Sequence, residues 1–191
     1  MKFITALLEP KFQIPVDRKR FTNKFLTSLI VPLFIEQFLI MLVGIADTLM
    51  VSYAGQESVS GVSLVSMFVT IFIYIFTALA AGGAVVISQY IGKKDKAMSN
   101  FAASQLITLA LLVSTGATIL MLFFNESILR TLYGSVDPNV MESSLTYLRI
   151  TTLYFPALAL YNAGAAIFRS MGKTKVAMYI SLLMNVVHVI G

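Results

Sequence analysis

Residues 59–91 read VSGVSLVSMFVTIFIYIFTALAAGGAVVISQYI, and this run decides the fold. It is apolar almost throughout and well exceeds the roughly 20 residues that an α-helix needs to cross the hydrocarbon core of a bilayer. The strands of a membrane barrel would be shorter and would alternate between apolar and polar side chains. The run therefore predicts a membrane-spanning helix.

Four further apolar runs predict further helices of the same kind. They cover about residues 25–53, 101–124, 145–168 and 176–191, and the last is still apolar where the sequence stops. Polar residues gather between the runs, and the longest connection covers about residues 125–144, with Gly134 and Pro138 as helix breakers. We expect an all-α membrane protein, a polytopic helical bundle of about five transmembrane helices over residues 25–191.

The composition agrees with a membrane protein. Of the 191 residues, 58% are hydrophobic and only 12% are charged, whereas a soluble chain averages about 45–50% and about 25%. The high hydrophobicity excludes a disordered chain. The absence of cysteine excludes a disulfide scaffold, thiolate catalysis and cysteine metal sites.

The basic residues predict the orientation in the membrane. Segment 1–24 holds six of the 14 Lys and Arg residues, the connection after residue 91 holds three, and the connection after residue 168 holds three. These connections alternate with the predicted crossings, so the positive-inside rule places segment 1–24 in the cytoplasm. The net charge of +5 therefore indicates contact with anionic lipid, and we expect no nucleic-acid partner.

Two carboxylates lie inside the first apolar run, Glu36 and Asp47. Their spacing of 11 residues brings them to within about 20° of one helix face and about 16 Å apart along the axis. No Lys or Arg lies within this run, so the face that carries them should line protein or a water-filled cavity rather than lipid. Either carboxyl is a candidate to carry a proton or to hold Na⁺. The alternative for Asp47, which is in the outer part of the run, is a hydrogen bond to a neighbouring helix.

Other polar residues within the runs are weaker candidates. Pro32 and Pro156 each free a backbone carbonyl and permit a bend in their helices. A lone histidine is most simply a hydrogen-bonded core residue. The residues that we expect to line a cavity or a cation site are Gln37, Asn162, Asn185 and His188.

Several segments together resemble the multidrug and toxic compound extrusion (MATE) family. Residues 44–55, GIADTLMVSYAG, resemble the family's first-helix signature. Residues 59–64, VSGVSL, and 82–92, GGAVVISQYIG, are similar to the two ends of its second helix, and residues 168–175, FRSMGKTK, to the junction after its fourth. The resemblance extends from about residue 25 to the end of the sequence.

The resemblance implies a secondary antiporter of the plasma membrane that exports organic cations and drugs in exchange for H⁺ or Na⁺. Family members have two six-helix lobes, so this chain would be an incomplete N-terminal lobe that works with a C-terminal lobe. Asp47 matches the family's cation-site aspartate, and Asn185 or His188 would match the asparagine of the fifth helix. Glu36 matches no family position and is a candidate from its place in the membrane alone. We expect no cofactor, no enzymatic activity and no metal other than Na⁺ at Asp47.

Three other functions remain open. A lipid-linked saccharide flippase of the same superfold would need a basic cavity, and the apolar runs offer little Lys or Arg. A non-transporting anchor or assembly subunit would tolerate neutral residues in place of Glu36 and Asp47. An intramembrane enzyme is disfavoured, because the carboxyl separation of about 16 Å is too long for two-carboxylate chemistry.

Overall fold

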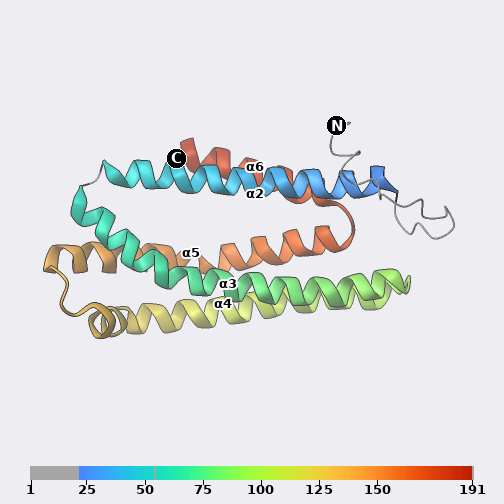
Figure 1. Ribbon diagram of the computed structural model, residues 1–191. Helices are drawn as coiled ribbons and strands as arrows, with labels where there is room; N and C mark the ends of the chain where they lie inside the picture. Colours follow the sequence, from blue (N-terminus) through green and yellow to red (C-terminus); the bar gives the residue numbers. More distant parts are fainter. Residues whose placement is uncertain (1–21, 54, 191) are drawn as a thin grey trace, which may run out of the picture. The chain divides into compact units, whose positions relative to one another are not determined.

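The computed structural model describes residues 22–53 and 55–190, with side chains up to residue 187. Over these residues the chain is helical and contains no strand, which confirms the predicted all-α fold. Most of the predicted N-terminal segment, residues 1–21, lies outside the described part. The helices are α2 (Asn23–Ser52), α3 (Gln56–Gly92), α4 (Lys96–Tyr133), α5 (Pro138–Ser170) and α6 (Thr174–Ile190) (Figure 1).

The helices extend past the apolar runs, and the predicted connection at residues 125–144 is wrong in its length. Helix α4 continues to Tyr133 and α5 begins at Pro138, so only residues 134–137 connect them. The additional turns of α4 still pack against the bundle, since Asn125 and Leu129, four residues apart, are both buried. The two breakers therefore mark the true ends, and Pro138 occupies the first helical position, where its missing N–H costs nothing.

The chain divides into two compact units, which we describe separately. One contains residues 44–171, that is, the last turns of α2 and all of α3, α4 and α5. The other contains the described residues 22–43 and 172–190, that is, the first part of α2 together with α6. Because the boundary falls inside α2, one helix contributes to both units.

Helices α3, α4 and α5 pack against one another in all three pairs and form the three-helix bundle of the larger unit (Figure 1). Its core is a single cluster that runs from Leu129 and Leu148 to Ile87 and Leu106. Phe155 of α5 lies at its centre, with ring centroids 5.0 Å from Phe72 and 5.6 Å from Phe76 of α3, within the range of favourable aromatic pairs.

Two glycines of α3 allow neighbouring helices to approach closely. A Cβ atom at Gly61 would lie 3.0 Å from the backbone nitrogen of Ser144 on α5. A Cβ atom at Gly83 would lie 2.5 Å from Leu106 Cδ1 on α4, whereas one at Gly82 would meet nothing within 4 Å. Of these two adjacent glycines, only Gly83 therefore lies at a close helix contact. Small residues at such crossings are typical of membrane helices.

A threonine satisfies the carbonyl that Pro156 frees in the bundle. Proline has no N–H to donate to the carbonyl four residues earlier, which belongs to Thr152. The Thr118 hydroxyl of α4 donates to this Thr152 oxygen across 3.1 Å, and both threonines are buried. Most other hydroxyls of the bundle donate to a carbonyl of their own helix three or four residues earlier, as those of Thr70, Ser114 and Thr152 do.

The smaller unit repeats this arrangement around Pro32 of α2. Pro32 frees the carbonyl of Ser28, and the hydroxyl of Thr174, the first residue of α6, donates to that oxygen across 3.4 Å. Thr174 is buried. Gly172, with φ of +72°, makes the turn that brings α6 to this point, a conformation that glycine adopts without strain.

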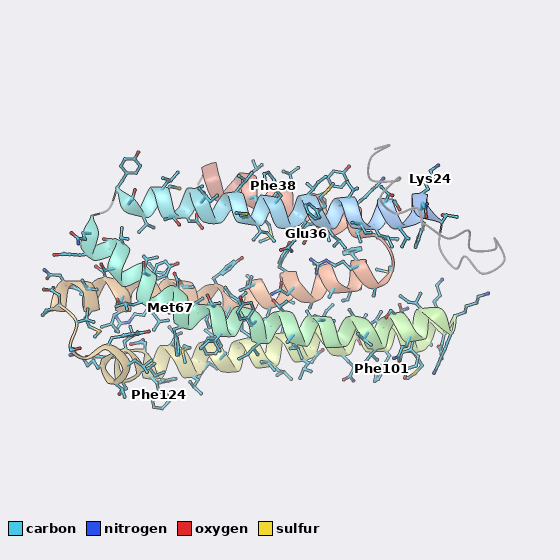
Figure 2. All side chains as sticks on the ribbon, in the orientation of Figure 1. Lys24, Glu36, Phe38, Met67, Phe101 and Phe124 are labelled. Atoms are coloured by element: carbon cyan, nitrogen blue, oxygen red, sulfur yellow. The ribbon has the colours of Figure 1, made fainter. Side chains whose placement is uncertain are left out.

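The outer surface is strongly apolar. Four helices of the described residues, α2 to α5, are long and apolar enough to cross a membrane, whereas α6 is shorter. Exposed side chains include Met67, Phe101 and Phe124, and the two phenylalanines point away from the bundle (Figure 2). A soluble protein rarely exposes such contiguous apolar surface, so lipid is its natural solvent.

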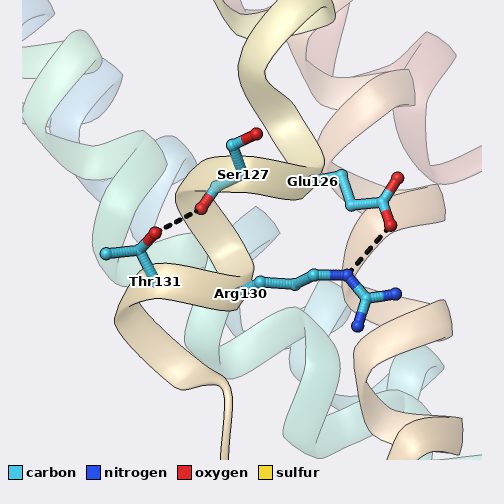
Figure 3. Close-up of polar contacts among 4 residues, drawn as sticks. All are labelled: Glu126, Ser127, Arg130 and Thr131. Carbon is cyan, nitrogen blue, oxygen red and sulfur yellow. Dashed lines mark hydrogen bonds and ion pairs between the residues drawn. The ribbon is translucent and has the colours of Figure 1, made fainter.

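Most exposed charged residues of the described helices lie near helix ends, and Arg149 within α5 is an exception. Near the end of α4 the Arg130 Nε atom donates to Glu126 Oε1 across 2.9 Å, and the Thr131 hydroxyl donates to the Ser127 carbonyl (Figure 3). Both charged side chains are more than half exposed. An exposed pair of this spacing contributes only about 0.3–0.5 kcal/mol.

Candidate functional site

The two carboxylates of α2 differ in their surroundings. Glu36 is only 1% exposed and lies four residues after Pro32, which is also buried, so both belong to one face of the helix. Phe38 points to the opposite side of α2 (Figure 2) and is 58% exposed. Asp47 is half-buried and lies five residues before the end of α2 at Ser52.

Neither carboxylate faces open lipid with its full surface, as the cost of a charge in hydrocarbon requires. Glu36 belongs to the smaller unit and Asp47 to the larger one. Gln37, the immediate neighbour of Glu36, is exposed. Glu36 therefore lies on the buried face of α2, and Gln37 does not. This separation follows from the rotation of about 100° between successive helical residues.

Asn162 is the predicted polar residue of α5, and it is half-buried in the larger unit. Its neighbours Ala163, Ala165 and Ala166 are buried and small. The Nδ2 atom of Asn162 is buried and has no hydrogen-bond partner among the described residues. Leaving a buried donor unsatisfied costs about 1–3 kcal/mol, so Asn162 stays a candidate for the predicted cavity lining.

Asn185 of α6 has the same property in the smaller unit. It is half-buried, and its Nδ2 atom is buried without a hydrogen-bond partner in the part of the chain that the structure describes. His188 lies three residues further along α6, but its side chain is outside the described residues. The two asparagines therefore provide one buried, unsatisfied amide in each unit.

A polar groove at the start of α3 and α5 was not anticipated from the sequence. It has a volume of about 590 Å³ and is lined by residues that include Glu57, Asn139, Glu142 and Tyr147. The Asn139 amide donates to Glu57 Oε1 across 3.2 Å and joins the two helices. These residues belong to the ends of α3 and α5, in segments that the sequence analysis had assigned in part to connections.

Comparison with known proteins identifies the chain's relatives. The uncharacterized transporter YisQ of Bacillus subtilis is 29% identical over 166 residues, which is 87% of this chain and 36% of that protein. The multidrug resistance protein PmpM of Pseudomonas aeruginosa is 28% identical over 173 residues, 88% of this chain and 36% of that protein. The chain thus spans about 36% of the length of these curated relatives.

Solved structures show the same fold. A crystal structure of MATE in complex with MaD3S superimposes with a TM-score of 0.83 and 25% identity, and covers 87% of this chain and 37% of that one. A MOP superfamily transporter from Pyrococcus furiosus, described as having a binding pocket of reverse polarity, superimposes with a TM-score of 0.80 and 26% identity. The superposition covers 87% of this chain and 36% of that one.

The family model of MatE matches residues 32–191, which include most of α2 and all of α3 to α6. This match agrees with the long apolar helices of a multi-pass membrane protein. The chain belongs to the MatE family and corresponds to its N-terminal lobe.

Proposed function

We propose that this chain is part of a secondary active antiporter that exports organic cations, drugs or other xenobiotics in exchange for H⁺ or Na⁺. The observation that carries the proposal is the MatE match over a helix, α2, that holds two carboxylates within its membrane-spanning length. Ionisable groups at such depth are costly and are retained where ions bind or pass. The multidrug resistance protein of Pseudomonas aeruginosa supports an export role.

Asp47 is the residue that we assign to ion coupling. It is half-buried near the end of α2, where a carboxylate is close enough to water to exchange H⁺ or Na⁺ and is partly shielded from it. Binding of the ion neutralises the carboxylate and favours the conformation in which it is desolvated. By linkage, an ion that changes the affinity for the drug is affected equally by the drug.

The asparagines and Glu36 are further proposed ion-binding residues, with Asn162 in the unit of Asp47 and with Glu36 and Asn185 in the other unit. Asn162 and Asn185 each offer a buried, unsatisfied Nδ2 donor and, on the same amide, a carbonyl oxygen that suits Na⁺. Glu36 is a second proton carrier because it is almost fully buried. Gln37 and His188 are assigned to the cavity lining on their sequence positions alone.

In the proposed orientation the protein lies in the plasma membrane with its N-terminus in the cytoplasm. The turns after α3 and α5, which contain Lys93, Lys94 and Lys173, would then face the cytoplasm. The polar groove of Glu57 and Asn139 would face outward. The drug and a C-terminal lobe are the proposed partners, and no step requires a cofactor or a catalytic residue.

An ion-driven efflux assay on the full-length protein tests this proposal. We expect Asp47→Asn to reduce efflux of a cationic dye at least tenfold under an imposed H⁺ or Na⁺ gradient, each gradient being varied separately. The matched control is Glu126→Gln, which makes the same change at the exposed pair with Arg130 (Figure 3) and should leave efflux unchanged. Undiminished, fully coupled efflux by Asp47→Asn would exclude the role of Asp47.

A further inference from the structure

An apolar groove runs along the exposed surface of the bundle between α3 and α4. It has a volume of about 470 Å³. Leu106 lies at its base and packs where Gly83 has no side chain. Its walls include Val86, Leu109 and Leu112, which are all more than 40% exposed.

The groove has the length of one leaflet. On α3 it extends from Leu79 to Tyr90, about 16 Å at 1.5 Å per residue, and on α4 from Met98 to Leu112, about 21 Å. Half of the hydrocarbon core is about 15 Å thick. With the lysine-bearing turn between α3 and α4 taken to lie at the membrane surface, the other end of the groove lies near the middle of the membrane.

The surface end of the groove is basic. The turn and the start of α4 contain Lys93, Lys94 and Lys96, all exposed. Lys93 Nζ lies 5.8 Å from the centre of the Tyr90 ring, which itself lines the groove. The acidic residue among them, Asp95, accepts the Met98 backbone N–H across 3.0 Å and caps α4. This end of the groove therefore carries three lysines and one aspartate, and the aspartate already accepts a hydrogen bond from the backbone of α4.

We propose that this groove binds one anionic phospholipid, with an acyl chain along α3 and α4 and the phosphate headgroup at the lysines of the turn. The apolar walls match a hydrocarbon chain in character and in length. The surplus of positive charge at the surface end selects a headgroup with net negative charge over a zwitterionic one. The proposal does not depend on antiport.

Native mass spectrometry of the delipidated full-length protein tests this site. The probes are dioleoylphosphatidylglycerol and dioleoylphosphatidylcholine, which share their acyl chains and differ in headgroup charge. We expect tighter binding of the phosphatidylglycerol. The double variant Lys93→Gln/Lys94→Gln should weaken it at least tenfold, because each lysine beside an anionic surface contributes about fivefold, or about 1 kcal/mol, while binding of phosphatidylcholine should not change.

Two further variants separate the groove from general charge. Lys173→Gln/Lys175→Gln removes the same charge from exposed positions at the turn before α6 and at its start and should leave the phosphatidylglycerol affinity within twofold. Val86→Trp should obstruct the acyl chain and weaken both lipids. The proposal is overturned if phosphatidylglycerol binds no more tightly than phosphatidylcholine, if the Lys93/Lys94 variant binds as the wild type does, or if the Lys173/Lys175 variant loses as much affinity.

Discussion

The hydroxyl of Thr118 should stabilise the bundle because Pro156 leaves the Thr152 carbonyl without a backbone donor. The change Thr118→Val keeps the shape of the side chain and removes the hydroxyl that donates to that oxygen across 3.1 Å. Thr152 is only 1% exposed, so water does not replace the lost donor. The variant therefore buries an unsatisfied carbonyl, and this is the physical source of the expected loss.

The expected loss is about 1–1.5 kcal/mol in the free energy of unfolding. Burying an unsatisfied polar group costs about 1–3 kcal/mol, but side-chain hydrogen bonds between membrane helices average only about 0.6 kcal/mol and reach about 1.7. The hydrogen bond from Thr118 to Thr152 is buried and 3.1 Å long, and its acceptor has no backbone donor. Its contribution should therefore lie near the upper end of the range for hydrogen bonds between membrane helices. Thr118→Ser, which keeps the hydroxyl, should lose less than half as much.

A double-mutant cycle with Pro156→Ala isolates this bond. Alanine restores the N–H that donates to the Thr152 carbonyl, so in that background Thr118→Val should cost less than about 0.5 kcal/mol, a coupling of about 1 kcal/mol. The free energies are measured by reversible unfolding of the full-length protein in lipid bicelles. An equal cost of Thr118→Val with and without Pro156 would refute the reasoning, since the hydroxyl would then act by packing alone.

Two further changes test the helix contacts. Gly61→Ala should be less stable than Gly82→Ala by about 1–3 kcal/mol in the free energy of unfolding. Both variants gain the same helix propensity, but only Gly61→Ala places a Cβ atom 3.0 Å from the backbone of α5. Equal thermal stability of the two purified variants would contradict the close approach of α3 and α5 at Gly61. Thr174→Val should cost about 0.5 kcal/mol, less than Thr118→Val, because its bond to the Ser28 carbonyl is longer at 3.4 Å. Chemical unfolding measures this loss, and a larger cost than that of Thr118→Val would contradict it.

The apolar runs predicted the helices because hydrocarbon dictates composition over the length of a crossing. They could not predict the helix ends, since the last turns of α4 and the first turns of α5 lie beyond the hydrocarbon and are decided by packing. Leu129, for example, is fully buried in the bundle although it follows the polar residues Asn125 and Glu126. Pro138 and Gly134 marked the ends more accurately than hydropathy did.

The candidate site was predictable only in part. Helix rotation alone distinguishes Glu36, which is buried, from Gln37, which is exposed. The burial of the Asn162 and Asn185 Nδ2 atoms, and their lack of a hydrogen-bond partner among the described residues, are properties that no spacing along the chain reveals. Gly61 carried a weak signal, a glycine among serines, but its contact with Ser144 joins residues 83 apart.

The hydroxyls that donate to their own helices have a consequence for biogenesis. Thr70, Ser88, Ser104 and others already satisfy their donors within one segment. Most of the hydroxyl donors for which a hydrogen bond is described are therefore satisfied before the neighbouring helices arrive, and this lowers the cost of placing each segment in the bilayer alone. Thr118 and Thr174 are exceptions, because each donates to a carbonyl of another helix. Among the described helices, the proline-bearing α2 and α5 each carry a carbonyl to which another helix donates, so assembly of the nascent protein should pause most readily at these two helices.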